Sequence, residues 1–253
     1  MRLLTLARDL RRRKAREKRG LFVAEGVRAV EELVKSSLPI EGILVAPMVE
    51  EAPRGAVLVA QIRDRGLTLE SVAANEFASA AETESPQGIL ALARIPTVTL
   101  DEIPAADSLR LLILDAVQDP GNVGTIVRTA LAMGADATVA LPGTVDLWNA
   151  KVVRSAMGAH FHHTAIHATW DELSAFRSKR DLALWGADAA GTPIPVPIPI
   201  PKRLGLVVGN EGAGLTDVVR SSLDRLVSIP MSPRAESLNV AVATGILLHE
   251  VRA

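Results

Sequence analysis

Polar side chains able to take part in chemistry gather in the C-terminal part of this chain, at the ends of short apolar runs. The first run, LGLVV at residues 204–208, stops at GNEGAG, residues 209–214, where Asn210 and Glu211 supply an amide and a carboxylate. A short run with β-branched residues that ends in glycines is typical of a buried strand feeding a loop. The sequence therefore predicts a strand followed by a glycine-rich polar loop.

A second run, residues 226–229, repeats this arrangement. The loop after it leads to Ser237, which we expect to cap a nearly all-apolar helix with Asn239 in its first turn. Parallel α/β sheets bind ligands at the carboxyl ends of their strands, so both loops are candidates for one site. Glycines after a strand also make ordinary turns, and the pattern alone leaves a ligand site and a simple turn equally open.

A third candidate region lies upstream. Residues 111–115 are predicted to form a strand, and residues 116–121 a loop before a helix at residues 122–133 with Asn122 as its N-cap. Arg128 projects from this helix among apolar neighbours and needs a partner. It is either an active-site cation or half of a surface salt bridge.

Four stretches together resemble the motifs of one known family. They are residues 111–130 (LLILDAVQDPGNVGTIVRTA), 209–215 (GNEGAGL), 229–231 (IPM) and 236–250 (ESLNVAVATGILLHE). They are similar, in order, to the motifs of the SpoU or TrmH family of SPOUT RNA ribose 2′-O-methyltransferases. The resemblance implies an α/β fold whose C-terminal parallel-sheet SPOUT domain contains a trefoil knot, in a homodimer with its interface beside the cofactor loops. Periodicity would never predict a knot, because knotted chains are rare.

The resemblance also assigns roles to residues. It implies an S-adenosyl-L-methionine site with contacts at Gly209, Asn210, Ile229, Met231, Ser237 and Leu238, and no metal ion. It implies a catalytic set of Arg128, Asn122, Glu211, Ser237 and Asn239. Arg128 matches an arginine often proposed as the base toward the ribose hydroxyl. Because a guanidinium is effectively always protonated, we prefer an electrostatic role for it, and the sequence leaves both roles open.

The N-terminal part alternates between helix and strand patterns. Helices are expected at residues 22–37, 57–65 and 75–80, and strands at residues 43–46, 67–72 and 88–93. Through FVAEGVRAVEE and SPQGILALA, this part resembles the L30e-like substrate-binding domain that precedes the catalytic domain in several family members. The alternative is any small α/β sandwich. The predicted organisation is an RNA-binding domain at residues 1–95, a linker at 96–108 and a methyltransferase domain at 109–253.

Positive charge is concentrated near the N-terminus. Eight of the 28 basic residues but two of the 29 acidic residues lie in residues 8–19, although the net charge of the whole chain is -1. Such a cluster is typical of a nucleic-acid patch, a membrane-surface patch or a solvated helix. Aromatic residues make up 3% of the chain, which weakens the membrane interpretation. The expected RNA-binding residues are Arg11, Arg12, Arg13, Lys14 and Arg28.

The sequence thus predicts an S-adenosylmethionine-dependent RNA 2′-O-ribose methyltransferase acting on 23S-type ribosomal RNA. The alternatives are a tRNA 2′-O-methyltransferase and a non-catalytic RNA-binding or ribosome-assembly protein on the same fold. The L30e-like resemblance favours ribosomal RNA, and an intact motif set argues against a non-catalytic protein.

Composition excludes several other classes. The chain has no cysteine, so disulfides, thiol catalysis and cysteine zinc sites are ruled out. No apolar run approaches a membrane span, and a cytoplasmic location is expected. His160, His162, His163 and His167 lie in or beside a strand expected at residues 161–166, where alternation points His162 away from His163. Only some of the four could converge, and no carboxylate or cysteine partner is nearby, which disfavours a metal site. Residues 193–201, with proline at every second position, are expected to form an extended surface connection.

Overall fold

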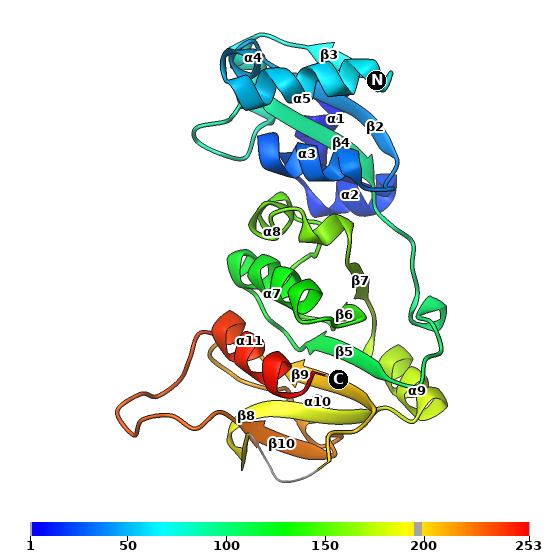
Figure 1. The fold of residues 1–253 in the computed structure, drawn as a ribbon, viewed down its shortest axis with the longest axis vertical. Helices are drawn as coiled ribbons and strands as arrows, with labels where there is room; N and C mark the ends of the chain where they lie inside the picture. The colour runs from blue at the N-terminus through cyan, green and yellow to red at the C-terminus, as the bar shows by residue number, and fades with distance from the viewer. Residues whose placement is uncertain (1, 195–198, 253) are drawn as a thin grey trace. The chain divides into compact units, whose positions relative to one another are not determined.

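The computed structural model describes residues 2–194 and 199–252. These residues form two compact units (Figure 1). Unit 1 takes its described residues from Met1–Thr97 and Trp148–His162, and unit 2 from Val98–Leu147 and His163–Ala253. Unit 1 is thus built from two separate stretches of sequence, the second of which interrupts unit 2.

Unit 1 is built on a four-stranded sheet with the order β1-β4-β2-β3. Strand β4 is antiparallel to β1 and β2, and β2 is parallel to β3. Its strands are β1 (Leu21–Glu25), β2 (Ile40–Val45), β3 (Leu69–Ser71) and β4 (Ile89–Arg94). Its helices are α1 (Leu3–Leu10), α2 (Arg13–Arg19), α3 (Val27–Lys35), α4 (Met48–Glu51), α5 (Pro53–Asp64), α6 (Ala74–Ala80), α8 (Ala150–Ser155) and the 3-10 turn η2 (Ala159–Phe161). The small α/β unit expected from the sequence is therefore present.

The expected helix at residues 22–37 is wrong in its first part. Residues 22–25 belong to β1, which is buried along its whole length beside β4. Gly26 then adopts a φ of 98°, which side-chain-bearing residues rarely tolerate, and α3 starts at Val27. The helical spacing of apolar residues continues into β1 by coincidence, and burial of both faces of that strand decides the outcome.

Unit 2 contains a six-stranded parallel sheet with the order β10-β8-β9-β5-β6-β7, which confirms the predicted α/β class. Its strands are β5 (Leu109–Leu114), β6 (Ala137–Ala140), β7 (Thr164–His167), β8 (Ala183–Pro193), β9 (Arg203–Val208) and β10 (Arg225–Ser228). Its helices are α7 (Pro120–Ala132), α9 (Trp170–Arg180), α10 (Asp217–Arg220), α11 (Val240–Glu250) and the 3-10 turn η1 (Leu100–Glu102). The positions of β5, β9 and β10 match the expected strands closely.

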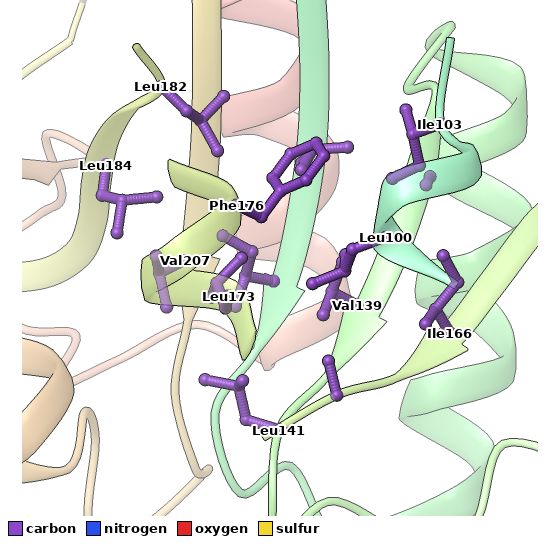
Figure 2. Packing of buried hydrophobic residues seen from close by; sticks show 14 of the residues in the cluster. Leu100, Ile103, Val139, Leu141, Ile166, Leu173, Phe176, Leu182, Leu184 and Val207 are labelled. Carbon is purple, nitrogen blue, oxygen red and sulfur yellow. The ribbon is translucent and has the colours of Figure 1, made fainter. Parts of the chain in front are cut away.

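The core of unit 2 lies between the sheet and α9. Leu173 and Phe176 of α9 pack among strand residues such as Val139 and Val207 (Figure 2). Leu100, within the segment expected to be a linker, is buried in this same cluster, as Figure 2 also shows. Part of that segment is therefore core material of unit 2.

Helices α7 and α11 pack against each other. A Cβ atom added to Gly245 of α11 would lie 3.4 Å from the methyl group of Thr129 on α7. The two helices lie side by side in Figure 1. Because each helix begins after a loop at the carboxyl end of a strand, this packing holds the loop after β5 near the loop after β10.

Most of the connection between β6 and β7, Trp148–His162, belongs to unit 1. Its aromatic residues explain why: the ring of Phe22 lies 4.6 Å from that of Trp148 and 5.8 Å from that of Phe161, measured between centroids. Linear domain boundaries do not describe this excursion. The strand expected at residues 161–166 begins later than predicted, because Phe161 lies in η2 and β7 is Thr164–His167.

The proline-rich stretch is described only in part. Pro193 ends β8, where it pairs with Ser228 of β10. Residues 195–198 lie outside the described residues. The extended surface connection expected at residues 193–201 therefore stays a prediction.

Candidate active site at the carboxyl ends of three parallel strands

Loops that follow β5, β9 and β10 meet at one edge of the unit 2 sheet. Strands β5 and β9 are neighbours, and β10 pairs with β8 on the other side of β9. All these pairs are parallel, so their carboxyl ends lie at the same edge. The three regions that the sequence singled out are thereby brought together.

The loop after β9 has a fixed conformation. Backbone N–H groups of Gly212 and Ala213 each donate to Oδ1 of Asn210 at 2.9 Å, and Nδ2 of Asn210 donates to the carbonyl of Ala116 at 3.0 Å. A Cβ atom on Gly209 would lie 2.4 Å from the carbonyl carbon of Gly214, so only glycine fits at that position. Asn210 therefore shapes its own loop and ties it to the loop after β5.

Asp115 provides a second tie between these loops, and sequence reasoning missed it. Its buried carboxylate accepts the backbone N–H of Thr216 at 2.7 Å and the hydroxyl of Thr216 at 3.2 Å. The available signal was an acidic residue directly after an apolar strand, since such a group must find donors when it is buried.

Three expected catalytic residues form a hydrogen-bonded relay. Nδ2 of Asn239 donates to Oδ1 of Asn122 at 2.9 Å, and Nδ2 of Asn122 donates to Oε1 of Glu211 at 3.0 Å. At the other end, Oδ1 of Asn239 accepts the backbone N–H groups of Ala241 at 2.9 Å and Val242 at 3.3 Å. One residue from each motif region contributes to this relay.

The direction of the relay is set at both ends. The backbone N–H groups of α11 can only donate, so Asn239 must present its oxygen to them and its NH₂ to Asn122. An ionised carboxylate can only accept, so Asn122 must present its NH₂ to Glu211. Burial raises the pKa of Glu211, but hydrogen bonds from Asn122 and from backbone groups outweigh this and bring the pKa below its usual value. Glu211 is therefore the charged end of the relay.

Both helix caps differ from the prediction by a few residues. Asp119, not Asn122, caps α7, accepting the backbone N–H of Asn122 at 2.7 Å. Asn239, not Ser237, caps α11. All these residue types are good caps, so the sequence pattern could not choose among them. The shift matters, because it leaves the side chain of Asn122 free to bridge Asn239 and Glu211.

A hollow lies beside the relay and contains every residue expected to contact the cofactor. Its lining includes Gly209, Asn210, Ile229, Met231, Ser237 and Leu238. Glu211 also lines it, as does Asp188 of β8, which sequence reasoning missed. A hydrogen bond from Arg220, offset in part by burial, holds the pKa of Asp188 below its usual value. The hollow thus offers apolar walls, loop backbone and the three carboxylates of Asp188, Glu211 and Glu236.

This lining fits S-adenosyl-L-methionine. The cofactor has an apolar-faced adenine, a cationic sulfonium and an ammonium group, which suit apolar walls and carboxylates respectively. Gly209 lets the backbone of Gly214 and Leu215 pack directly against it, which fixes this wall of the hollow. Ile229, Met231 and Leu238 would hold the adenosyl part, since they are apolar side chains that the loop after β10 contributes to the lining.

Arg128 is separate from the relay. Its side chain is exposed on α7, and it makes no hydrogen bond or ion pair with any residue that the structure describes. Arg128 comes six positions after Asn122 on the same helix, about 9 Å further along the helix axis. The relay therefore does not orient the guanidinium, which is free to meet an external anion.

The basic segment near the N-terminus folds as α1 and α2. Arg12 pairs with Asp9, and Arg13 pairs with Glu17 at 2.7 Å. Arg11 and Lys14 are exposed, and Arg28 is exposed on α3. Arg16 is buried and donates to the carbonyls of Leu10 at 2.8 Å and Arg11 at 3.0 Å, so this basic residue is a structural cap of α1.

The histidines at residues 160–167 make separate contacts. The ring of His160 meets that of Trp148 edge-on at 4.4 Å, whereas His163 hydrogen-bonds Thr138 at 2.8 Å. His167 accepts the backbone N–H of Leu147 at 3.2 Å. Within residues 2–194 and 199–252, no group of three or more His, Asp or Glu side chains is arranged to hold a metal ion. No helix of the described chain is long and apolar enough to span a membrane.

Family models match both parts of the chain. Residues 110–249 match the SpoU rRNA Methylase family, and residues 5–91 match the MRM3-like substrate binding domain. The second match covers the part of the sequence that resembles an L30e-like domain.

Individual relatives agree with these matches. The chain is 35% identical to the 23S rRNA (guanosine(2553)-2'-O)-methyltransferase RlmP of Bacillus subtilis, over 97% of this chain and 94% of that protein. It is 30% identical to the 23S rRNA (uridine(2479)-2'-O)-methyltransferase of Streptomyces viridochromogenes, over 95% of this chain and 85% of that protein.

Solved structures give the same result. The SpoU methyltransferase AviRb of Streptomyces viridochromogenes in complex with AdoMet is similar with a TM-score of 0.87 and 28% identity, covering 99% of this chain and 97% of that one. An AdoMet-bound rRNA methyltransferase from Sinorhizobium meliloti has a TM-score of 0.83 and 28% identity, covering 98% and 93%. The resemblance in the sequence motifs is thus confirmed, and the chain belongs to the SpoU rRNA methylase family.

Proposed function

We propose that this protein is an S-adenosyl-L-methionine-dependent RNA 2′-O-ribose methyltransferase that acts on 23S-type ribosomal RNA. The observation that carries the proposal is the relay from Asn239 through Asn122 to Glu211, which joins all three motif regions beside a hollow that fits the cofactor. The named relatives act on 23S rRNA, on a guanosine in one case and a uridine in the other. The target nucleotide is therefore not part of the proposal.

Transfer of a methyl group from the sulfonium of S-adenosylmethionine requires an aligned hydroxyl and an outlet for its proton. In this proposal, the loops around Gly209, Met231 and Leu238 hold the cofactor. Ser237 lies on the same lining and supplies a hydroxyl there. The relay fixes the Asn122 amide and the Glu211 carboxylate, which shape the site around the ribose. Because the relay is directional, neither amide can flip without losing a hydrogen bond.

Arg128 is proposed to act as a fixed cation. Its guanidinium stays protonated, so it is a poor base but a strong partner for a phosphate group and for the developing alkoxide of the ribose. Its exposure and lack of a partner within the described chain favour a role toward the RNA. The hydroxyl proton then leaves to water or to the adjacent phosphate.

We further propose a homodimer that covers one face of α11. Val242 and Ile246 of α11 are four residues apart and are 52% and 38% exposed, and Leu238, which lies in the loop before the N-cap Asn239, is 37% exposed. Side chains at this spacing share one face of a helix. Leu238 also lines the hollow, so a second copy packed on this row would border the cofactor loops. We also propose that the C-terminal methyltransferase domain contains the expected trefoil knot.

The N-terminal part is proposed to bind the RNA. The match to a substrate binding domain supports this role, as does the exposed basic row of Arg11, Arg12, Arg13 and Lys14. Such contacts to phosphates give affinity without reading the sequence. Ribosomal RNA as the substrate places the activity in the cytoplasm.

Mapping of 2′-O-methyl groups in ribosomal and transfer RNA, with and without the protein, tests the function. The expected result is a new methyl group at one nucleotide of 23S-type rRNA. A methyl group in tRNA would instead support the tRNA alternative. RNA binding without any methyl transfer would support the non-catalytic assembly protein.

A further inference from the structure

A second hollow lies in unit 1, at the amino end of α3. Its lining includes Arg28, Arg54 and Arg154 together with the polar side chains of Glu25, Ser85 and Gln87. Arg28 and Arg54 lie in the N-terminal stretch, whereas Arg154 comes from α8 in the excursion between β6 and β7. The hollow therefore combines side chains from the two stretches that build unit 1.

The walls of this hollow are held in place. The buried carboxylate of Glu25 accepts the backbone N–H of Glu82 at 2.8 Å and the hydroxyl of Thr83. Oε1 of Gln87 accepts the backbone N–H of Val27 at 2.8 Å. The loop before β4 is thereby fixed against the start of α3, and the negative charge of Glu25 is already satisfied by donors.

Two of the three guanidinium groups lack a partner among the residues that the structure describes. Nη1 of Arg154 is buried and has no hydrogen-bond acceptor among the described residues. Arg28 is exposed and makes no ion pair with the described chain, whereas Arg54 is neutralised by Glu31. A buried guanidinium nitrogen without an acceptor is destabilising, so its presence needs a reason. An anion in the hollow would provide one.

The backbone adds donors at the same place. Arg28 and Ala29 are in the first turn of α3, where N–H groups have no acceptor inside the helix. Gln87 satisfies the N–H of Val27, and no described acceptor faces those of Arg28 and Ala29, which line the hollow. The positive end of the helix dipole adds to the attraction for an anion.

We propose that this hollow binds a backbone phosphodiester of the substrate RNA, held between Arg28 and Arg154. Planar guanidinium groups match phosphate oxygens in pairs. The lining contains no aromatic side chain on which a base could stack, so the contact is to the backbone and carries no sequence information. This inference rests on the proposed function, because it takes RNA as the ligand.

The site also links the two family-matched regions. Arg28 lies within residues 5–91, matched by the substrate binding domain, and Arg154 lies within residues 110–249, matched by the methylase family. One phosphate bound by both residues bridges the N-terminal stretch and the β6–β7 excursion. Arg154 is thus a substrate-positioning residue outside the cofactor loops.

The test is RNA binding by the full-length protein across a salt series, using a 23S rRNA transcript that the wild type methylates. Arg28→Gln and Arg154→Gln should each weaken binding by on the order of tenfold. The double variant should flatten the slope of log affinity against log salt by about 0.7 to 0.9, as expected for one lost phosphate contact. Arg63→Gln, which removes an exposed arginine of α5 that pairs with Glu50, is the matched control and should change neither quantity.

Further measurements separate binding from folding and from catalysis. Arg154→Gln should unfold at a temperature no lower than that of the wild type, because the variant removes a buried guanidinium nitrogen that has no acceptor among the described residues. Arg154→Lys keeps the charge and should retain the wild-type salt slope, with weaker binding. Affinity for S-adenosylmethionine, measured by calorimetry, should be unchanged in all variants, and the defect should appear in KM rather than kcat.

An unchanged salt slope in the double variant, with a wild type that methylates the transcript, overturns the inference and leaves the proposed function intact. A salt slope that flattens in Arg154→Lys as much as in Arg154→Gln also overturns it, since the role would then be structural. If the wild type methylates no RNA, the proposed function is wrong, and the inference that rests on it is wrong as well.

Discussion

The side-chain amide of Asn122 donates to the carboxylate of Glu211 at 3.0 Å, although the two residues are 89 positions apart in the sequence. Asn122 is in the first turn of α7, and Glu211 is in the loop after β9. This hydrogen bond therefore joins the start of α7, which follows β5, to the loop after the neighbouring strand β9. Asn239 extends it to α11, whose first N–H groups complete the relay.

The relay predicts a specific effect of Asn239→Ala. The variant loses the cap of α11, which costs about 1 kcal/mol of stability, and leaves Asn122 without its donor. Activity should fall by on the order of a hundredfold while the protein stays folded. Thr169→Ala, which removes the cap of α9 away from the site, is the matched control. It should lose a similar amount of stability and keep its activity. Equal activity losses in both variants would mean that the relay acts only through stability.

Much of unit 2 could be predicted from its sequence, because apolar runs ending in glycine or polar loops define its strands. The relay could not be predicted in detail. Ser237 and Asn239 are equally good caps on paper, and only the packed structure shows which one caps α11. Asp115 follows an apolar strand and was overlooked, whereas Asp188 lies within β8, where a single carboxylate cannot be told from a solvated side chain until its donor Arg220 is visible.

The excursion between β6 and β7 was beyond the reach of the sequence. In the sequence, Trp148 and Phe161 look like ordinary apolar residues of the helix or strand that contains them. In the structure, both rings pack against Phe22, which is more than 100 positions away in the chain. Local periodicity carries no information about such long-range partners. The same limit explains why Arg154 was not considered as a binding residue.

Arg128→Ala should lower turnover by on the order of a hundredfold or more, because this cation is proposed to stabilise the transition state. Affinity for S-adenosylmethionine should be nearly unchanged. A methyl-transfer assay beside calorimetry measures both. Arg128→Lys keeps the charge and should retain more activity than Arg128→Ala, with the pH dependence of the wild type. If cofactor binding disappears together with activity, the role proposed for Arg128 is wrong.

A charge on the exposed row of α11 should break the proposed dimer. Val242→Glu places a carboxylate where a second copy is expected to pack, and the variant should sediment as a monomer at concentrations where the wild type is a dimer. Val218→Glu is the control, since Val218 of α10 is similarly exposed but is not part of this row. A wild type that is monomeric and fully active would remove the dimer from the proposal.

His163 predicts a dependence of stability on pH. Burial, opposed only in part by the charge of Asp136, lowers the pKa of His163 to about 4 from a usual value of 6.5. The folded protein therefore resists protonating this ring, so its contribution to stability is present above pH 6.5 and is lost as the pH falls toward 4. Thermal unfolding of His163→Gln should show a smaller loss of stability over this range than the wild type. Parallel curves for the two proteins would contradict the assignment.

The basic row on α1 and α2 should contribute to RNA affinity and not to the choice of nucleotide. Arg11, Arg12, Arg13 and Lys14 are exposed, although Arg12 and Arg13 are held by acidic neighbours. If about half of the positive charges in residues 8–19 meet phosphates, replacing these four residues with glutamine should flatten the salt slope of log affinity by roughly two units. Cofactor affinity should not change.

Arg16 provides the contrast for this variant. It belongs to the same basic segment but is buried, and Arg16→Gln should destabilise the protein because the carbonyls of Leu10 and Arg11 lose their donor. The fourfold variant should unfold at a temperature close to that of the wild type. The measurements are RNA binding across a salt series, thermal unfolding and mapping of the methyl site. An unchanged slope would show that the exposed row is only a solvated surface, and a relocated methyl group would show that it selects the target.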